Sequence, residues 1–246
     1  MVRASVVLSV DIGIRNLGLC VLSRDPDKPR DMLGYNIKLW DVYNTIDDEN
    51  NLCSSLTKTM KKCSKKGSYL EDGSYFCKTH YKSTFKKTPP KPVKKKTIKS
   101  MLLQDIISQF LKKLNSIIED NLEIFNIVDK ICIELQPKIN PKMKMISHVL
   151  FGKMVEYYNT IDRKISIRFV PASKKLKCYT GPMIGGHRKN SYSKRKWLAV
   201  QYSTWFIEEK FHPDEKSKWS ESYCKDTKKR DDMADVLLMC INEFKF

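Results

Sequence analysis

The sequence predicts an α/β protein in which a mixed five-stranded sheet is flanked by helices and interrupted by a basic insertion containing Cys and His. Two observations predict this fold class. Segments with strand-like apolar patterns alternate with segments whose apolar residues recur at helical spacing. Between the third strand and the first long helix, aliphatic residues become rare and basic residues crowd in. We therefore divide the chain into a first part of the main domain over residues 1–44, an insertion over 45–96, and the remainder of the main domain over 97–246.

The charge of the chain predicts a polyanionic partner. Its 246 residues carry a formal net charge of +18, with a sequence pI near 9.5, and nucleic acid is the first candidate for such a basic protein. No stretch approaches 18 consecutive apolar residues, and the first eleven residues lack the features of a signal peptide. We expect a soluble intracellular protein that does not bind membranes, whose eight cysteines are not paired in disulfides.

Three strands are predicted before the insertion, over residues 5–11, 17–22 and 36–43. The first is uncharged and apolar up to Asp11, which is typical of a strand buried on both faces. The three strands follow one another closely enough to form an antiparallel meander. A buried carboxylate at Asp11 needs a positive partner, such as an arginine, backbone amides or a divalent metal. The plainer interpretation is that Asp11 only hydrogen-bonds its own turn.

The insertion contains a candidate zinc site formed by Cys53, Cys63, Cys77 and His80. Cys77 and His80 have a Cys-x-x-His spacing, which lets two side chains bind one tetrahedral ion. Because so few residues of the insertion are apolar, it cannot fold by hydrophobic burial alone, and a structural zinc would supply the missing stability. The gap from Cys53 to Cys63 is long for a zinc knuckle and leaves the fourth ligand open. A metal-free flexible insertion with incidental thiols is the alternative.

The rest of the insertion is interpreted from its lysines, aromatic residues and prolines. Its lysines suit contact with phosphates, and Tyr69, Tyr75, Phe76 and Tyr81 suit stacking on bases. A solvated, disordered loop is the alternative. Residues 86–96 contain three prolines and predict an extended linker.

A second carboxylate is predicted at the end of the fourth strand. Helical spacing over residues 97–118 predicts a helix that packs on the sheet. Residues 127–135 then predict a strand with Glu134 at its C-terminal end. After a crossover helix this strand should lie parallel to the first and beside it, which would put Glu134 next to Asp11. A surface glutamate at a strand terminus is the ordinary alternative.

Further elements are predicted between this strand and the end of the chain. Residues 141–161 predict a long helix whose broad apolar stripe suits a core or a partner helix, and residues 166–170 a short strand. Residues 173–196 are rich in Lys, Arg, Gly and Ser and predict a mobile basic loop that could lie on DNA. Helical spacing resumes over residues 197–206.

The last predicted helix supplies two more acids. It begins in basic residues 228–230 and presents Asp232 and Asp235 on one face, because residues three apart are neighbours on a helix. Like charges pressed toward a sheet need a cation between them, although an acidic first turn is also what any helix N-terminus prefers. If these two acids converge with Asp11 and Glu134, the four carboxylates would bind two divalent ions of the magnesium or manganese type.

The order and context of the acids resemble the RNase H-like superfamily. Residues 11–16 (Asp-Ile-Gly-Ile-Arg-Asn), 133–136 (Ile-Glu-Leu-Gln) and 232–235 (Asp-Met-Ala-Asp) look like the RuvC-like Holliday junction resolvases, in particular those of poxviruses and related large DNA viruses. The resemblance covers residues 6–21, 130–170 and the last twenty. The Cys/His-bearing insertion departs from the pattern of the smallest members.

The resemblance implies an activity, cofactors and partners. It implies hydrolysis of DNA phosphodiesters in four-way junctions by two metals about 3.5 to 4 Å apart, which leaves 5′-phosphate and 3′-hydroxyl ends. It also implies a homodimer that makes paired symmetric nicks, with the helix over 141–161 contributing to the dimer face. The implied location is the cytoplasm for a poxvirus-type protein, with the nucleus also open.

The resemblance also assigns roles to residues. It implies that Asp11, Glu134, Asp232 and Asp235 bind the metals and that Lys228 or Lys229 touches the scissile phosphate, Lys229 being the one we select. Contacts to nucleic acid are expected from Arg15, Asn16, Lys174, Lys175, Arg188 and Lys194.

Two other functions are compatible with these features. One is a different RNase H-like nuclease, of the transposon or RNA-guided type, in which acids also accompany a zinc knuckle. The other is a non-catalytic basic nucleic-acid-binding protein whose acids only decorate the surface. Cleavage of a four-way junction, compared with plain duplex, distinguishes the three.

Overall fold

The computed structural model describes residues 5–24, 34–46, 52–57, 59–93, 98–137, 139–186, 190–211, 213–225 and 229–244. The chain divides into two compact units. We call residues 1–46 together with 103–246 the sheet unit, and residues 47–102 the cysteine unit.

The sheet unit is built on five strands in the order β3-β2-β1-β6-β7. Their bounds are β1 (Ser5–Ile12), β2 (Asn16–Arg24), β3 (Tyr35–Asn44), β6 (Lys130–Glu134) and β7 (Ser166–Val170). The first three strands are antiparallel neighbours, whereas β6 is parallel to β1 and β7 is parallel to β6. The predicted mixed five-stranded sheet is therefore confirmed.

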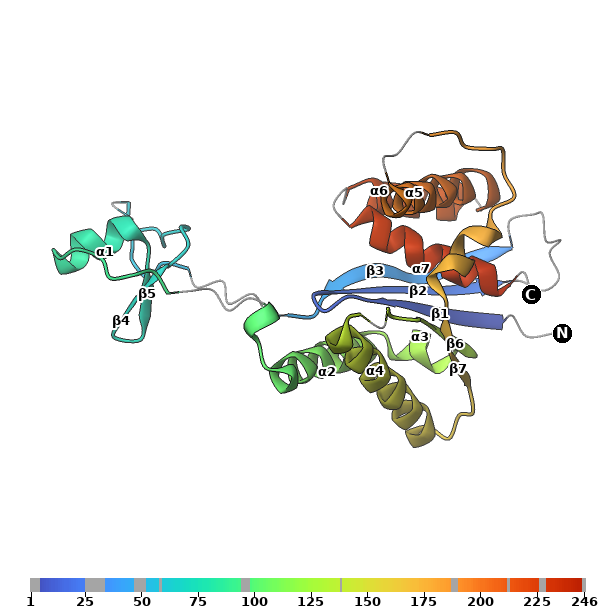
Figure 1. Ribbon diagram of the computed structural model, residues 1–246, viewed down its shortest axis with the longest axis horizontal. Coiled ribbons are helices and arrows are strands. Elements are labelled where there is room, and N and C mark those ends of the chain that lie inside the picture. The colour runs from blue at the N-terminus through green and yellow to red at the C-terminus, as the bar shows by residue number, and fades with distance from the viewer. Residues whose placement is uncertain are drawn as a thin grey trace. The chain divides into compact units, whose positions relative to one another are not determined.

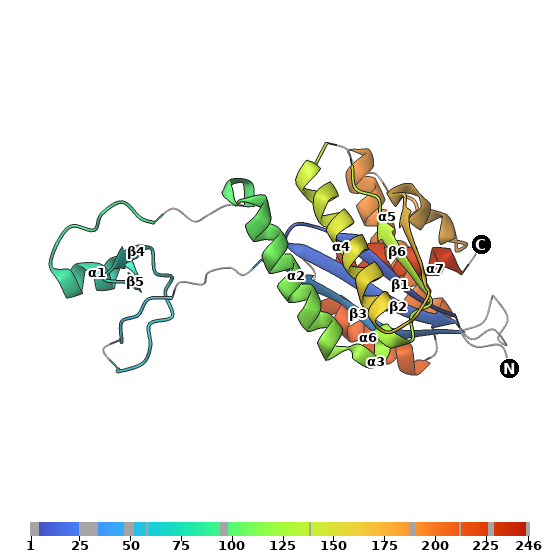
Figure 2. The ribbon, with the colours of Figure 1, turned by 90° about the horizontal axis from the view of Figure 1, so that it is seen from below.

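Helices cover both faces of the sheet (Figures 1 and 2). One face carries α2 (Leu103–Asp120), α3 (Leu122–Asn126) and α4 (Pro141–Thr160), and the other carries α5 (Ser191–Lys210), α6 (Pro213–Lys225) and α7 (Arg230–Glu243). Because β1 lies in the middle of this sandwich, its residues from Val6 to Val10 are buried on both sides. That position explains the uninterrupted apolar run before Asp11.

The strand register brings two acids to the same edge of the sheet. Val10 of β1 pairs with Ile133 of β6 in the parallel ladder, so the next residues, Asp11 and Glu134, leave the ladder side by side. The expected parallel placement of the fourth strand beside the first is therefore confirmed. Directly after β1, the turn into β2 is closed by a hydrogen bond from the Gly13 N–H to the Asn16 carbonyl at 2.7 Å.

The prediction of a basic loop over residues 173–196 is wrong at both ends of this range, where the structure has helices. A 3₁₀ helix, η2 (Ala172–Cys178), follows β7 directly. Helix α5 begins at Ser191, six residues before the predicted start, because the Asn190 side chain caps it by accepting a hydrogen bond from the Ser193 N–H at 2.7 Å. Helix α6 was not predicted at all.

The cysteine unit contains a hairpin and a short helix. Strands β4 (Tyr69–Glu71) and β5 (Ser74–Phe76) pair antiparallel across a turn in which Asp72 and Gly73 have positive φ. Helix α1 (Lys78–Phe85) follows, with the Cys77 sulfur as its N-cap acceptor, and a 3₁₀ turn, η1 (Ile98–Ser100), comes near the end of the unit.

The aromatic side chains of the cysteine unit form its small core. Tyr69 and Tyr81 are buried, and Tyr81 packs against Tyr69, Phe76 and Phe85 with ring centroids 5.0 to 6.4 Å apart. Tyr69, Phe76 and Tyr81 were expected to stack on bases. In the structure Tyr69 and Phe76 instead pack against Tyr81 in the core of the unit.

None of the helices within the described ranges combines the length and the apolar character that crossing a bilayer requires.

Candidate active site

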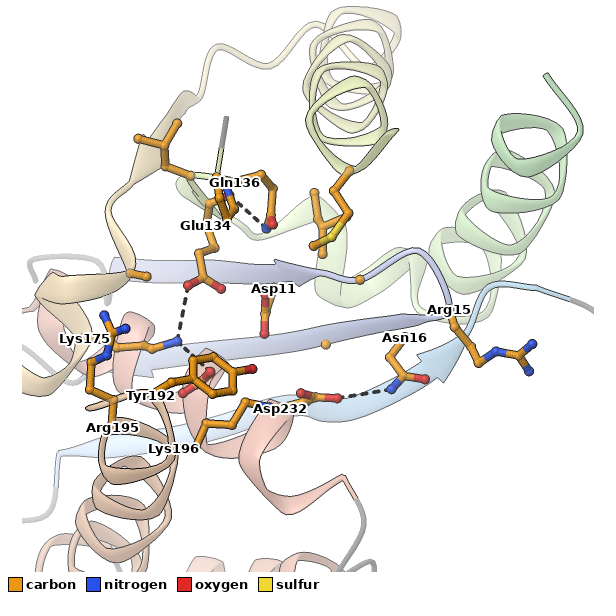
Figure 3. A pocket seen from close by; sticks show the side chains of 18 of the residues that line it. Asp11, Arg15, Asn16, Glu134, Gln136, Lys175, Tyr192, Arg195, Lys196 and Asp232 are labelled. Carbon is orange, nitrogen blue, oxygen red and sulfur yellow. Dashed lines mark hydrogen bonds and ion pairs between the residues drawn. The ribbon is translucent and has the colours of Figure 1, made fainter. Parts of the chain in front are cut away.

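Three of the four predicted acids meet at one edge of the sheet. Asp11 comes from the end of β1, Glu134 from the end of β6 and Asp235 from α7, and a carboxylate oxygen of each lies within 4.8 Å of the other two. Figure 3 shows the side chains of Asp11 and Glu134 reaching into the same space from their neighbouring strands. Three acids from distant parts of the sequence thus share a space small enough for one ion to touch all of them.

Close packing of α7 on the sheet places Asp235 in this group. A Cβ at Gly18 of β2 would lie 3.2 Å from Val236 Cγ1 and 3.7 Å from Asp11 Cβ, so the helix approaches β2 closely where β2 carries no side chain. The Ser9 hydroxyl donates to the Val236 carbonyl, and the Trp40 indole N–H donates to the Met233 carbonyl at 2.9 Å. These contacts fix both the height and the rotation of α7 above β1.

A buried lysine lies among the acids. Lys175 Nζ is 2.6 Å from Asp235 Oδ2. It is also 3.3 Å from Glu134 Oε1 (Figure 3). The lysine reaches this position because η2 turns back over the edge of the sheet directly after β7. Lys175 was predicted to contact nucleic acid from a mobile loop, but it is 9% exposed and its charge is directed at the acids.

The electrostatics of the acids follow from burial and mutual repulsion. Burial and the adjacent Glu134 carboxylate raise the pKa of Asp11 well above its usual range. Burial would also raise the pKa of Glu134, but a hydrogen bond with Asp11 and the charge of Lys175 outweigh it and lower that pKa. Burial raises the pKa of Asp235 to about 6 despite the opposing charge of Lys175. Asp11 and Asp235 therefore hold a proton more readily than exposed aspartates do, whereas Glu134 loses its proton more readily.

Asp232 lies on the same wall of the site but outside the three-acid group. It is one turn before Asp235 on α7, and its Oδ2 accepts a hydrogen bond from Asn16 Nδ2 at 3.2 Å (Figure 3). Burial and the neighbouring Asp231 raise the pKa of Asp232. Asp232 thus lies near the other three acids without joining their group, and Asn16 orients its carboxylate.

A pocket of about 680 Å³ opens over the acids. Its wall includes Arg15 and Asn16 from the turn after β1, and Tyr192, Arg195 and Lys196 from the first two turns of α5. Sequence reasoning missed the three α5 residues because it started this helix at residue 197. The available signal for this helix start was Asn190, because asparagine is a favoured N-cap residue.

The cationic side chains of α5 have different surroundings. Lys196 pairs with Asp231 and lies 5.4 Å from the centre of the Tyr192 ring. Tyr192 is 60% exposed at the mouth of the pocket, and Arg195 is exposed beside it. The pocket therefore has an acidic floor and a basic, aromatic rim.

The other predicted contacts to nucleic acid lie outside the pocket lining. Lys229 occupies the N-cap position of α7 without a capping hydrogen bond from its side chain, and its Nζ donates to the Val42 carbonyl on β3 at 3.3 Å. Lys174 and Lys194 are exposed on η2 and α5. Arg188 and Lys228 lie outside the described residues.

A second group of potential metal ligands lies in the cysteine unit. One ligand atom from each of Cys53, Cys63, Cys77 and His80 lies within 4.8 Å of the others, and the three cysteines are buried together. Cys53 Sγ is 3.2 Å from His80 Nδ1. Burial would raise the pKa of the Cys53 thiol, but hydrogen bonds from the backbone of Cys77 and Ser55 and the contact with His80 lower it to about 6.

Comparison with known sequences gives limited information. No family model matches the chain. The uncharacterized protein L451 of Acanthamoeba polyphaga mimivirus is 29% identical over 194 residues, which are 69% of this chain. The match covers 46% of that protein, so the chain spans about half the length of the curated relative.

Solved structures similar to this chain include two resolvases. A Fowlpox virus resolvase in complex with its substrate Holliday junction DNA is 14% identical, with 98% of this chain and 97% of that chain covered and a TM-score of 0.49. T. thermophilus RuvC in complex with a Holliday junction substrate is 7% identical, with 96% and 91% covered and a TM-score of 0.42. The function of this chain has to be inferred from its own residues.

Proposed function

We propose that this chain is a metal-dependent DNA endonuclease of the RuvC-like type, which resolves four-way junctions by paired symmetric nicks that leave 5′-phosphate and 3′-hydroxyl ends. One observation carries the proposal: Asp11, Glu134 and Asp235 bring carboxylate oxygens within 4.8 Å of one another from three separate elements. The motif resemblance around the same residues supports it independently.

The acid cluster fits a hard divalent cation. Its donors are carboxylate oxygens, which magnesium and manganese prefer. Asp235 Oδ1 is buried and accepts no hydrogen bond from any described residue, and a buried anionic oxygen of this kind is costly without a cation. Asp11, Glu134 and Asp235 would bind the first ion, and Asp232 would join Asp11 at a second.

The chain's own residues then prepare the substrate. When bound, divalent ions in such sites activate water and stabilise charge on the phosphate. Lys175 holds a positive charge between Glu134 and Asp235, where it offsets the repulsion of the acids and can donate to a phosphate oxygen. Asn16 orients Asp232, and Arg15 and Arg195 line the pocket at positions suited to phosphate contacts.

We propose that the active protein is a homodimer. A four-way junction has two-fold symmetry, and a symmetric dimer presents two active sites related in the same way. The candidate face lies on α4, where Met145, His148, Gly152 and Val155 recur at helical spacing and are all exposed. Met145 is 47% and Val155 38% exposed, so the row has an uncovered apolar side chain at each end.

We also propose that Cys53, Cys63, Cys77 and His80 bind a structural zinc ion. Three thiols and one imidazole form a standard tetrahedral zinc set. The core of the cysteine unit otherwise consists of a few aromatic rings, which is too little to stabilise a fold of this size without a crosslink or a metal.

Cleavage of labelled DNA in magnesium tests the proposed activity. Wild-type protein should nick a four-way junction at paired, symmetric positions and leave plain duplex intact, and Asp11→Asn should abolish the nicks. Asp105→Asn, an exposed aspartate on α2, is the matched control and should cut normally.

The same experiment can reject the proposal. Cutting of plain duplex, or cutting that needs a guide strand, would indicate another RNase H-like nuclease. Intact DNA with both wild type and Asp11→Asn, under conditions where the protein binds the junction, would indicate a non-catalytic binding protein.

A further inference from the structure

The surface of the cysteine unit is dominated by lysines. Nine lysines within residues 52–57 and 59–93 are exposed, namely Lys61, Lys62, Lys65, Lys66, Lys78, Lys82, Lys86, Lys87 and Lys91. The same ranges contain only two acids, Glu71 and Asp72. Glu71 is already occupied, because it accepts hydrogen bonds from Tyr81 and Lys87 at 2.6 and 2.5 Å. Among the residues described, no carboxylate neutralises the other eight lysines.

Three of these lysines recur along one helix. Lys78 and Lys82 lie one turn apart on α1, and Lys86 follows at the C-cap, where its N–H donates to the Lys82 carbonyl at 3.0 Å. Lys78 and Lys82, four residues apart on the helix, therefore start about 5 to 6 Å from each other, and Lys86 follows in the left-handed region with a φ of 49°. A row of cations at this spacing suits a polymer with closely and regularly spaced charges, such as the phosphate backbone of nucleic acid.

The aromatic residues of the unit indicate which part of a nucleic acid it would contact. Stacking on bases requires exposed rings. Tyr69 is 8% and Tyr81 1% exposed, and Phe76 and Phe85 pack edge to face at 5.1 Å. Apart from the half-buried Tyr75, these rings pack against one another while the lysines are exposed, so the unit can offer charge to a backbone but little stacking to bases.

We propose that the cysteine unit is a second DNA-binding surface, separate from the active site, which holds duplex DNA by its phosphates without regard to sequence. The choice of DNA as the polyanion rests on the proposed nuclease function. The zinc ligands and the aromatic core give the unit its fold, and the row formed by Lys78, Lys82 and Lys86 provides the main contact. In a junction-cutting enzyme, such a surface would grip a duplex arm.

The test measures binding of labelled duplex and labelled four-way junction in a buffer without magnesium and without chelator, over a series of salt concentrations. The variant replaces Lys78, Lys82 and Lys86 with glutamine. Each lost phosphate contact should reduce the slope of log K against log salt by about 0.9, so the slope should fall by about 2 to 3. Binding near 0.1 M salt should weaken at least about tenfold for both DNAs.

A control variant separates a local contact from a general loss of charge. Lys112→Gln, Lys216→Gln and Lys218→Gln together remove the same charge from exposed positions of α2 and α6 in the sheet unit. This triple variant should keep a steeper salt slope than the α1 triple. Unchanged circular dichroism and zinc content of both variants would show that they are folded.

Two outcomes would overturn the proposal. One is an equal effect of the two triple variants on the salt slope. The other is unchanged DNA binding by the α1 triple together with loss of its binding to vesicles of anionic lipid, which would make a membrane surface the partner. Because the assay contains no magnesium, it reports on this surface even if the chain proves unable to cut junctions.

Discussion

Lys175 is the side chain on which the charge balance of the site depends. Two buried carboxylates, Glu134 and Asp235, have this ammonium group as their nearest cation. Removing one partner of a buried ion pair leaves the other uncompensated, which costs more than the pair contributed. The lysine thus serves a structural purpose when no metal is bound, in addition to any contact it makes with DNA.

Replacing Lys175 with methionine should destabilise the metal-free protein. In EDTA at pH 7.5 we expect a loss of about 2 to 4 kcal/mol in the free energy of unfolding, because Glu134 and Asp235 lose their counter-charge. Magnesium should then raise the melting temperature of Lys175→Met by more than it raises that of wild type. Differential scanning calorimetry measures both quantities. Lys174→Met, at the exposed neighbouring position, should behave like wild type, and equal magnesium responses of wild type and Lys175→Met would refute this role.

Asp235 should make the stability of the metal-free protein fall as pH rises. Its pKa is about 6 in the folded chain and about 3.8 ordinarily, so between pH 4 and 6 the folded state holds the proton more tightly than the unfolded state. The contribution of Asp235 to the free energy of unfolding is therefore greatest below pH 4 and declines by up to about 3 kcal/mol by pH 6.

The comparison with Asp235→Asn isolates this contribution. Urea unfolding in EDTA at several pH values from 4 to 7.5 should show wild type losing stability relative to Asp235→Asn as pH rises to 6, with a constant difference above pH 7. Asp105→Asn should show no such relative change. Parallel profiles for wild type and Asp235→Asn would contradict the raised pKa.

Strands and helices were predictable to the extent that burial determines their sequence. Strands β1, β2 and β6 and helix α7 could be located because they are buried along most of their length, and the half-exposed β3 because its apolar and polar residues alternate. Helix α6 could not be located, since it is polar and held by a few rings, including Trp219 and Tyr223 against Trp40 at 5.9 and 5.0 Å. Local pattern does not reveal such contacts between distant residues.

The same distinction holds for the site. Convergence of Asp11, Glu134 and Asp235 could be predicted because each acid follows or lies within a strongly patterned element, and the parallel crossover rule brings the strands together. The position of Lys175 could not, because it depends on a short 3₁₀ helix with no apolar period of its own. A run of basic residues cannot by itself show which lysine turns inward.

The packing of α7 on β2 should be sensitive to any side chain at position 18. Gly18→Val introduces a Cβ at 3.2 Å from Val236 Cγ1 with branches beyond it, and such overpacking costs about 1 to 3 kcal/mol. Because α7 also carries Asp235, magnesium binding measured by calorimetry should weaken as well. Gly185→Val is the control, since a Cβ there meets nothing within 4 Å. Unchanged stability and magnesium affinity of Gly18→Val would show that the helix can shift without harm to the site.

The molecule as a whole consists of two units that rely on different sources of stability. The sheet unit has a large apolar core spread over both faces of its sheet. Among the described residues of the cysteine unit, the buried hydrophobic ones are three cysteines and two tyrosines. We therefore expect the two units to unfold separately when metal is removed.

Chelation should unfold the cysteine unit and leave the sheet unit folded. After treatment with a zinc chelator, limited proteolysis should cut first within residues 47–102, while far-ultraviolet circular dichroism keeps most of its helical signal. Cys77→Ser should reduce bound zinc below one equivalent, as measured by mass spectrometry, whereas Cys132→Ala, a buried thiol of the sheet unit, should not. One zinc per chain in Cys77→Ser would contradict this ligand set.

The proposed dimer should depend on α4. Light scattering should give twice the chain mass of 28.8 kDa for wild type, and the double change Met145→Glu with Val155→Glu should give a monomer with an unchanged melting profile. Leu102→Glu, at a 62% exposed position outside α4, should remain dimeric. A wild-type monomer at micromolar concentration would remove this part of the proposal.

The contact between Ser9 and Val236 joins residues 227 positions apart, and this separation has a consequence for synthesis of the protein. A growing polypeptide on the ribosome presents Asp11 early and Glu134 midway, but it lacks Asp235 until α7 has been translated. The cysteine unit, in contrast, emerges in its entirety long before. Under the proposed nuclease function and the proposed DNA-binding surface, the nascent protein can bind DNA well before its active site is complete. An unfinished chain would therefore not cut the DNA that it binds.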